Sequence, residues 1–146
     1  GWVIMAIIVL AIPRISESDV LLETAYHFVE MGIGWEMFAS SVLAGAAITL
    51  MTWMEQGASS VGAKIVAVSS IAFVLAGTPL LHTVVSSLEM FGALQRSAAF
   101  GYVDWASVFG VAVVGNVVGG VGLVTVLRLV QARAEQPPDD PEVPAV

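Results

Sequence analysis

The chain has 146 residues and a formal net charge of −7; 58% of its residues are hydrophobic and only 12% are charged, where soluble domains have roughly 25% charged residues. With a mean hydropathy of +0.90, a soluble fold of this length would have no core large enough for so much apolar sequence, so the composition favours an all-α membrane protein. There is no cysteine, which excludes disulfides and thiolate sites, and no basic stripe of the kind that a nucleic-acid partner requires.

The first apolar stretch, residues 1–12, is about half as long as the roughly 20 residues that a transmembrane helix needs. No basic segment precedes it, as one would in a signal peptide. We therefore expect the end of a truncated transmembrane helix of a longer protein. Residues 13–36 follow as an acidic, extracytoplasmic connection with apolar residues at helical spacing, which predicts a short amphipathic helix capped by Ser16 or Ser18.

Three longer apolar segments and a polar tail complete the chain. Residues 37–54 carry no charge and have a tryptophan near each end, as is typical of a span between two membrane interfaces. Residues 64–91 predict a second, interrupted transmembrane helix, and residues 105–128 a third. Residues 132–146 are rich in Glu, Asp and Pro, and we expect a disordered cytoplasmic tail.

The basic residues near the spans indicate an orientation. Lys64, Arg128 and Arg133 lie on one predicted face of the membrane, and Arg14 and Arg96 lie on the other. Because basic residues are enriched on the cytoplasmic side, this distribution favours a cytoplasmic C-terminus.

The second span is the most informative segment. Residues 65–88 have no formal charge, yet Gly77, Thr78 and Pro79 lie near their middle. Proline lacks an N–H and clashes with the preceding turn, and glycine frees the backbone, so we expect the helix to be interrupted at about 77–81. The freed backbone groups would line a cavity, because lipid offers them no partners. The alternative is a proline kink packed against neighbouring helices.

Polar side chains follow the predicted break. Ionisable residues inside a membrane are costly, and beside this break we favour a pore position for His82 over a histidine hydrogen-bonded within the bundle. Thr83, Ser86 and Ser87 offer hydroxyl groups to the same pore, or alternatively small side chains for helix packing. Glu89 shares a helix face with His82, and near the end of the span we favour contact with water for it.

Two further features bear on a site. Lys64 either concentrates anions in a vestibule or anchors the span at the interface. Gly115, Gly119 and Gly120 give the last span a small-residue face for close helix packing, and the amide of Asn116 requires a partner if it is buried. The sequence contains no catalytic or metal-ligand cluster, so we expect no enzyme activity, metal or cofactor.

One ordered set of residues extends over the last two predicted spans: Lys64, Ile65, Phe73, Val74, Gly77, His82, Thr83, Val84, Gly115, Asn116, Gly119 and Gly120. This set resembles the formate/nitrite transporter family, over about residues 1–131. The chain departs from the family pattern in three ways. Leu81 replaces the glutamate before the histidine, Ser86 replaces the asparagine four residues after it, and the segment before His82 is about two residues longer. It therefore resembles a divergent branch.

The resemblance implies an aquaporin-like bundle of inverted three-helix repeats, of which these residues form the second, from the end of the third helix through the sixth. It also implies a homopentamer in the cytoplasmic (inner) membrane, with one pore in each subunit. In the family pattern His82 lies in the pore between two hydrophobic constrictions, with Asn116 nearby. Lys64 then lies towards the cytoplasmic vestibule, and Phe73 contributes to the periplasmic-side constriction.

These features predict a channel or transporter for small monovalent anions or their conjugate weak acids, of the formate/nitrite type. An anion drawn in by Lys64 would be protonated near His82 and would cross as the neutral acid, because a bare carboxylate is costly in an apolar slit. The alternatives are an aquaporin-like neutral-solute channel, for which Leu81 and Ser86 leave room, a membrane enzyme that uses His82 and Glu89, and a non-transporting pentameric scaffold.

Overall fold

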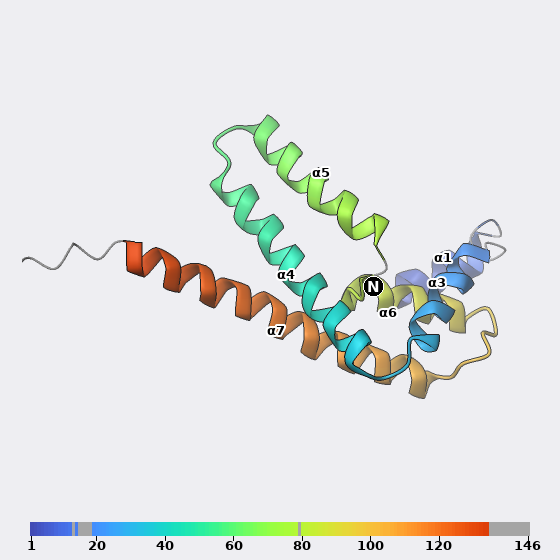
Figure 1. Cartoon of the computed structure of the whole chain (residues 1–146). Coiled ribbons are helices and arrows are strands. Elements are labelled where there is room, and N and C mark those ends of the chain that lie inside the picture. The colour runs from blue at the N-terminus through green and yellow to red at the C-terminus, as the bar shows by residue number, and fades with distance from the viewer. Residues whose placement is uncertain (13, 15–18, 79, 135–146) are drawn as a thin grey trace, which may run out of the picture.

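The structure is a computed structural model that describes residues 1–12, 14, 19–78 and 80–134. These residues form helices connected by short loops, with no strand among them (Figure 1). The helices are α1 (Trp2–Ala11), α3 (Asp19–Glu30), α4 (Trp35–Gly57), α5 (Val61–Gly77), α6 (Thr83–Leu94) and α7 (Tyr102–Ala134).

Two of the helices are long and apolar enough to cross a membrane, namely α4 and α7. Only 22% of the most apolar stretch of α4 and 17% of that of α7 is buried within the chain. The core helix of a soluble protein would instead be mostly buried. Apolar surface exposed along such long helices is suited to contact with lipid, so both the length and the exposure fit a helical membrane protein.

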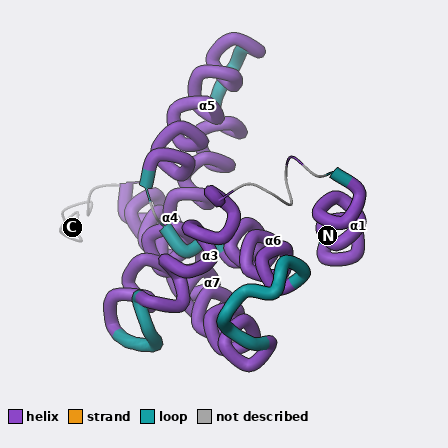
Figure 2. The backbone as a smooth tube through the Cα atoms, turned by 90° about the vertical axis from the view of Figure 1, so that its right-hand side faces the viewer, coloured by secondary structure: helices purple, strands orange, loops and turns teal. Residues whose placement is uncertain are grey.

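The helices are arranged around the contact between α4 and α7, which is the most extensive in the chain. Helix α5 runs back along α4 as the second arm of a hairpin and projects away from α6 and α7 (Figures 1 and 2). Helix α6 packs against α3 and α7, and α1 packs against α6. The α4–α5 hairpin and the α3–α6 pair therefore extend from opposite parts of the α4–α7 contact.

Glycine allows α4 and α7 to touch through their backbones. A Cβ atom added at Gly119 would collide with the backbone carbonyl of Val42, and one added at Gly115 would collide with Ser41. Across the same contact, a Cβ atom at Gly45 would collide with the backbone of Asn116. Small residues at these positions thus determine how closely α7 approaches α4.

Aromatic side chains hold α1 on α6 and α7. The ring of Trp2 lies edge-on to Trp105 at a centroid distance of 5.0 Å and to Phe109 at 5.7 Å. The indole N–H of Trp2 donates to Ser87 Oγ at 3.4 Å, and that of Trp105 donates to the Ser87 carbonyl at 3.0 Å. Ser87 therefore serves helix packing, which is the second of the two roles that its sequence position suggests.

The helix bounds differ from the predicted ones mainly at the C-terminus. Helix α7 continues to Ala134, so residues 132–134, which we expected to belong to a disordered tail, are helical. The prediction was wrong there because Leu, Gln, Arg and Ala after residue 128 are all good helix formers, and Arg133 in the last turn complements the helix dipole. Residues 135–146 and the predicted caps Ser16 and Ser18 lie outside the described residues.

The glycine contact gives a test of the packing. We expect Gly119→Ala to lower the free energy of unfolding by about 1–3 kcal/mol, because its Cβ meets backbone that cannot rotate away. Gly122→Ala is the matched control: it lies on the same helix with nothing within 4 Å of its added Cβ, so it should be neutral or stabilise the helix by up to about 1 kcal/mol. Thermal unfolding in detergent measures both variants, and equal effects would contradict the role of this contact.

Candidate functional site

The segment between α5 and α6 leaves helical geometry. Helix α5 ends at Gly77, and Thr78 is extended, with φ −125° and ψ 142°. His82 is also extended, with φ −88° and ψ 117°, and α6 begins at Thr83. The residue before a proline is disfavoured in the helical region, which accounts for Thr78. Gly77 itself is the last residue of α5, and Pro79 lies outside the described residues.

The side chain of Asn116 on α7 holds this break. Its Oδ1 accepts from the backbone N–H of Thr83 at 3.3 Å, which is the first amide of α6. Its Nδ2 donates to the carbonyl of Leu81 at 3.0 Å and to that of Ser41 on α4 at 2.9 Å. One amide thus binds both sides of His82 and connects the break to α4.

A second helix also contributes to the break. Ser40 Oγ on α4 accepts from the backbone N–H of Leu81 at 3.0 Å. The side chain of Leu81 is completely buried in the apolar core, next to residues such as Phe28 and Met90. Side chains of α4 and α7 therefore bind three peptide groups of the break, the Leu81 N–H, the Leu81 carbonyl and the Thr83 N–H, while the Leu81 side chain is packed in the apolar core.

Three polar atoms near the break remain without a hydrogen-bond partner among the described residues. They are His82 Nδ1, Thr83 Oγ1 and Ser86 Oγ, and all three are buried. Buried polar atoms in folded proteins almost always have partners, so an unpaired group of three at one place is unusual.

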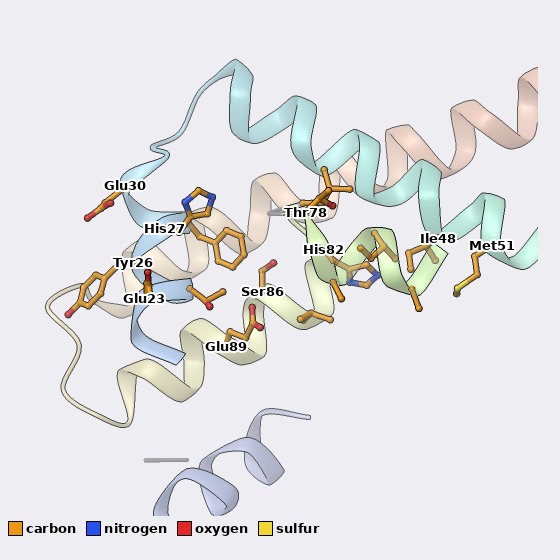
Figure 3. Close-up of a pocket in the computed structure, with 18 of the residues that line it drawn as sticks. Glu23, Tyr26, His27, Glu30, Ile48, Met51, Thr78, His82, Ser86 and Glu89 are labelled. Carbon is orange, nitrogen blue, oxygen red and sulfur yellow. The ribbon is translucent and has the colours of Figure 1, made fainter. Parts of the chain in front are cut away.

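His82 and Ser86 line an open cavity of about 1360 Å³ (Figure 3). One half of its wall, from α4 and α5, is apolar and includes Ile48, Met51, Val68, Ala72, Leu75 and Ala76. The other half, from α3 and α6, carries Glu23, His27, Glu30 and Glu89. His82 lies between the two halves, where the helix is broken.

The structure separates Lys64 from this group. Its Nζ forms a salt bridge of 3.0 Å with Glu55 Oε1, and both side chains are about two-fifths exposed, at 43% and 41%. The pair lines a neighbouring cavity of about 450 Å³ that shares Met51 and Val68 with the larger one. Lys64 therefore lies beyond the apolar half, on the side away from α3.

The side chain of Phe73 does not lie at this site in the structure. Its side chain is 81% exposed and does not line either cavity. The predicted place of Phe73 in a constriction stays a prediction.

Sequence reasoning missed Ser40 and the acidic residues of α3. Two adjacent serines, Ser40 and Ser41, in the middle of an uncharged span were a usable signal, since hydroxyl groups inside a membrane need partners. No such signal exists for Glu23 and Glu30, which reach the cavity only because α3 folds against α6. Among the described residues, no three His, Asp or Glu side chains are grouped so that they could hold a metal ion.

Comparison with known proteins gives one match. The family model described as formate/nitrite transporter matches residues 1–130. No curated protein and no solved structure matches the chain. The matched range includes all the helices except the last turn of α7, and it contains the break, Asn116 and both cavities.

The role of Asn116 gives a second test. We expect Asn116→Leu to accelerate hydrogen exchange of the amides of residues 80–83 and to destabilise the protein by roughly 1–3 kcal/mol for each backbone group left unpaired. Thr125→Val is the control, since its exposed hydroxyl binds only the Val121 carbonyl of its own helix among the contacts of the structure. Unchanged exchange in Asn116→Leu would show that the break does not depend on this amide; Ser40→Ala provides a milder second variant.

Proposed function

Because the chain belongs to the formate/nitrite transporter family, we propose that it passes small monovalent anions or their conjugate weak acids across the membrane along the cavity beside His82. The observation that supports this most strongly is the group of buried, unpaired polar atoms at the break: His82 Nδ1, Thr83 Oγ1 and Ser86 Oγ. Two of these residues, His82 and Ser86, line the cavity, and we propose that they offer hydrogen bonds to a solute at the point where the helix is open.

The apolar half of the cavity favours passage of a neutral species. Its walls from α4 and α5 carry no charged side chain among the described residues, and Met51 and Val68 separate the two cavities. Moving a carboxylate past such walls costs far more than moving the protonated acid. His82 stands at the inner end of these walls and exchanges the proton there, since imidazole gains and loses a proton near neutral pH. It takes the proton from an acid that has crossed from the Lys64 side, and it protonates an anion that is to cross towards that side.

The ammonium group of Lys64 attracts the anion at the end of the path that lies away from α3. Its partner Glu55 holds it in an exposed salt bridge, and such pairs are worth at most about 1 kcal/mol. An arriving anion can therefore compete for the ammonium group at little cost. Lys64 then acts as a gathering point in front of the apolar walls rather than as a binding site of its own.

The family resemblance supplies the wider architecture of the proposal. The chain contributes the second inverted repeat of an aquaporin-like bundle, assembled as a homopentamer in the cytoplasmic membrane with a cytoplasmic C-terminus. Helix α5 and helix α6 form the two halves of the interrupted transmembrane helix, and His82 lies at their junction.

The test is formate uptake by liposomes that contain the purified protein, measured at several external pH values. We expect uptake to rise as external pH falls, because more of His82 then carries a proton to exchange with the solute, and to fall to the level of protein-free liposomes in His82→Phe. His82→Gln keeps a hydrogen-bonding side chain without the titration, so it should retain some uptake but lose the pH dependence.

A pH-independent uptake that His82→Phe leaves unchanged would reject this function. If that result came together with rapid osmotic swelling in glycerol, it would indicate a neutral-solute channel instead. Size-exclusion profiles of each variant show whether the protein has kept its assembly.

A further inference from the structure

The smaller of the two cavities holds one charge of each sign. Within the part of the chain that the structure describes, Lys64 is its basic lining residue and Glu55 its acidic one. Lys64 Nζ donates to Glu55 Oε1 at 3.0 Å, and both side chains remain partly exposed to solvent. The rest of the lining is uncharged: Met51, Thr52, Ile65, Val68 and Ser69. The ammonium group that is to attract an anion is therefore already bound by a carboxylate of the chain itself.

Neither charge suits the end of its own helix. Glu55 lies in the last turn of α4, where the helix dipole is negative, and Lys64 lies in the first turn of α5, where the dipole is positive. Each placement is unfavourable by itself and is offset by the opposite charge across the tip of the α4–α5 hairpin (Figure 1). The two charges therefore do not serve the stability of their own helices, and what they share is the cavity.

Lys64 is the one cation of this cavity among the residues described. Arg128 of α7 lies over the ring of Trp53, 5.3 Å from its centroid. Trp53 and Glu55 are two positions apart on α4, so their side chains point to nearly opposite sides of that helix. Arg128 accordingly does not line the smaller cavity. An anion that enters this cavity meets one ammonium group, and that group is the one that Glu55 binds.

We propose that Glu55 competes with the transported anion for Lys64 and thereby sets how strongly the path attracts its substrate. The Glu55 carboxylate and a solute anion exclude each other at the ammonium group, so an arriving anion displaces Glu55 into water. The exposure of the pair makes this displacement possible, because the Glu55 side chain is 41% exposed and exposed ion pairs are weak. This inference rests on the proposed function, in which Lys64 attracts the anion in front of the apolar walls.

The competition has two consequences for transport. A solute crosses a pathway only if the attraction along it is weak enough for the solute to leave, and Glu55 rebinds the ammonium group whenever an anion moves on. A neutral solute gains little from a cation, so its passage does not depend on Glu55. Glu55 therefore acts on anions alone, and it adjusts the concentration at which they enter the path.

Glu55→Gln tests the competition through the exchange of labelled formate across liposomes that have equal formate concentrations on both sides. This exchange does not depend on the orientation of the inserted protein. We expect the half-saturating formate concentration to fall about three- to fivefold, which is the upper part of the range for an exposed ion pair. The maximal exchange rate should stay within about twofold, because a change in binding alone alters the half-saturating concentration and not the maximal rate.

The same change in the absence of Lys64 separates competition from simple repulsion between a carboxylate and an anion. Lys64→Gln alone should raise the half-saturating formate concentration. When Glu55→Gln is added to Lys64→Gln, that concentration should change by less than about twofold, since the two residues act through one contact.

Matched controls separate this role from a structural one. Glu36→Gln, the same change at an exposed position of α4 that lines neither cavity, should leave the half-saturating concentration unchanged. Glu55→Asp keeps the competing carboxylate and should stay closer to the unsubstituted protein than Glu55→Gln. Exchange of formamide, a neutral solute of similar size, should be the same in all of these proteins. If Glu55→Gln fails to assemble, Glu55→Ala takes its place in the same comparisons, since alanine suits a helix.

An unchanged half-saturating concentration in Glu55→Gln would overturn the inference, as would an equal fall with and without Lys64. In both cases the proposed function still stands if His82→Phe abolishes formate exchange. By contrast, the absence of formate exchange by the unsubstituted protein defeats the proposed function itself.

Discussion

The amide of Asn116 is the interaction on which the site depends. A helix that opens inside a membrane leaves peptide groups that lipid cannot bind, and each unpaired group costs several kcal/mol. Asn116 has one acceptor and two donors, and it uses them on the Thr83 N–H, the Leu81 carbonyl and α4. Since two of these bonds lie on either side of His82, the same contact that makes the break possible also fixes where the histidine lies.

The position of Asn116 depends in turn on glycine. An asparagine side chain is short, so it reaches the break only if α7 lies very close to α4. Gly45 faces the backbone of Asn116, and Gly115 and Gly119 face Ser41 and Val42. The glycines thus allow the short distance between α4 and α7 that the hydrogen bonds of Asn116 require. The close packing of the two helices and the polar contacts of the break therefore depend on each other.

The local features of the site follow from the sequence, and the long-range ones do not. Gly77, Thr78 and Pro79 predict an interruption by rules that concern neighbouring residues only, and the structure has Thr78 and His82 outside the helices. The need of Asn116 for a partner was also predictable, but its partners were not. They lie 33 to 75 residues away, and no spacing in one sequence encodes which helices will cross.

The same limit applies to the charges around the cavity. The Lys64–Glu55 pair forms across the turn between α4 and α5, and sequence alone left open whether Lys64 attracts anions or anchors the span. One end of the cavity is acidic because α3 folds back onto α6, so that Glu23 and Glu30 line the same cavity as Glu89. An acidic surface helix read by itself indicates only contact with water.

Leu81 shows how the break is held without a polar side chain of its own. In the pattern that the chain resembles, a glutamate precedes the histidine, but here Leu81 is completely buried among apolar side chains. The break does not need a polar side chain at this position, because Ser40 and Asn116 bind the backbone of Leu81 instead. A carboxylate in its place would be buried without compensation.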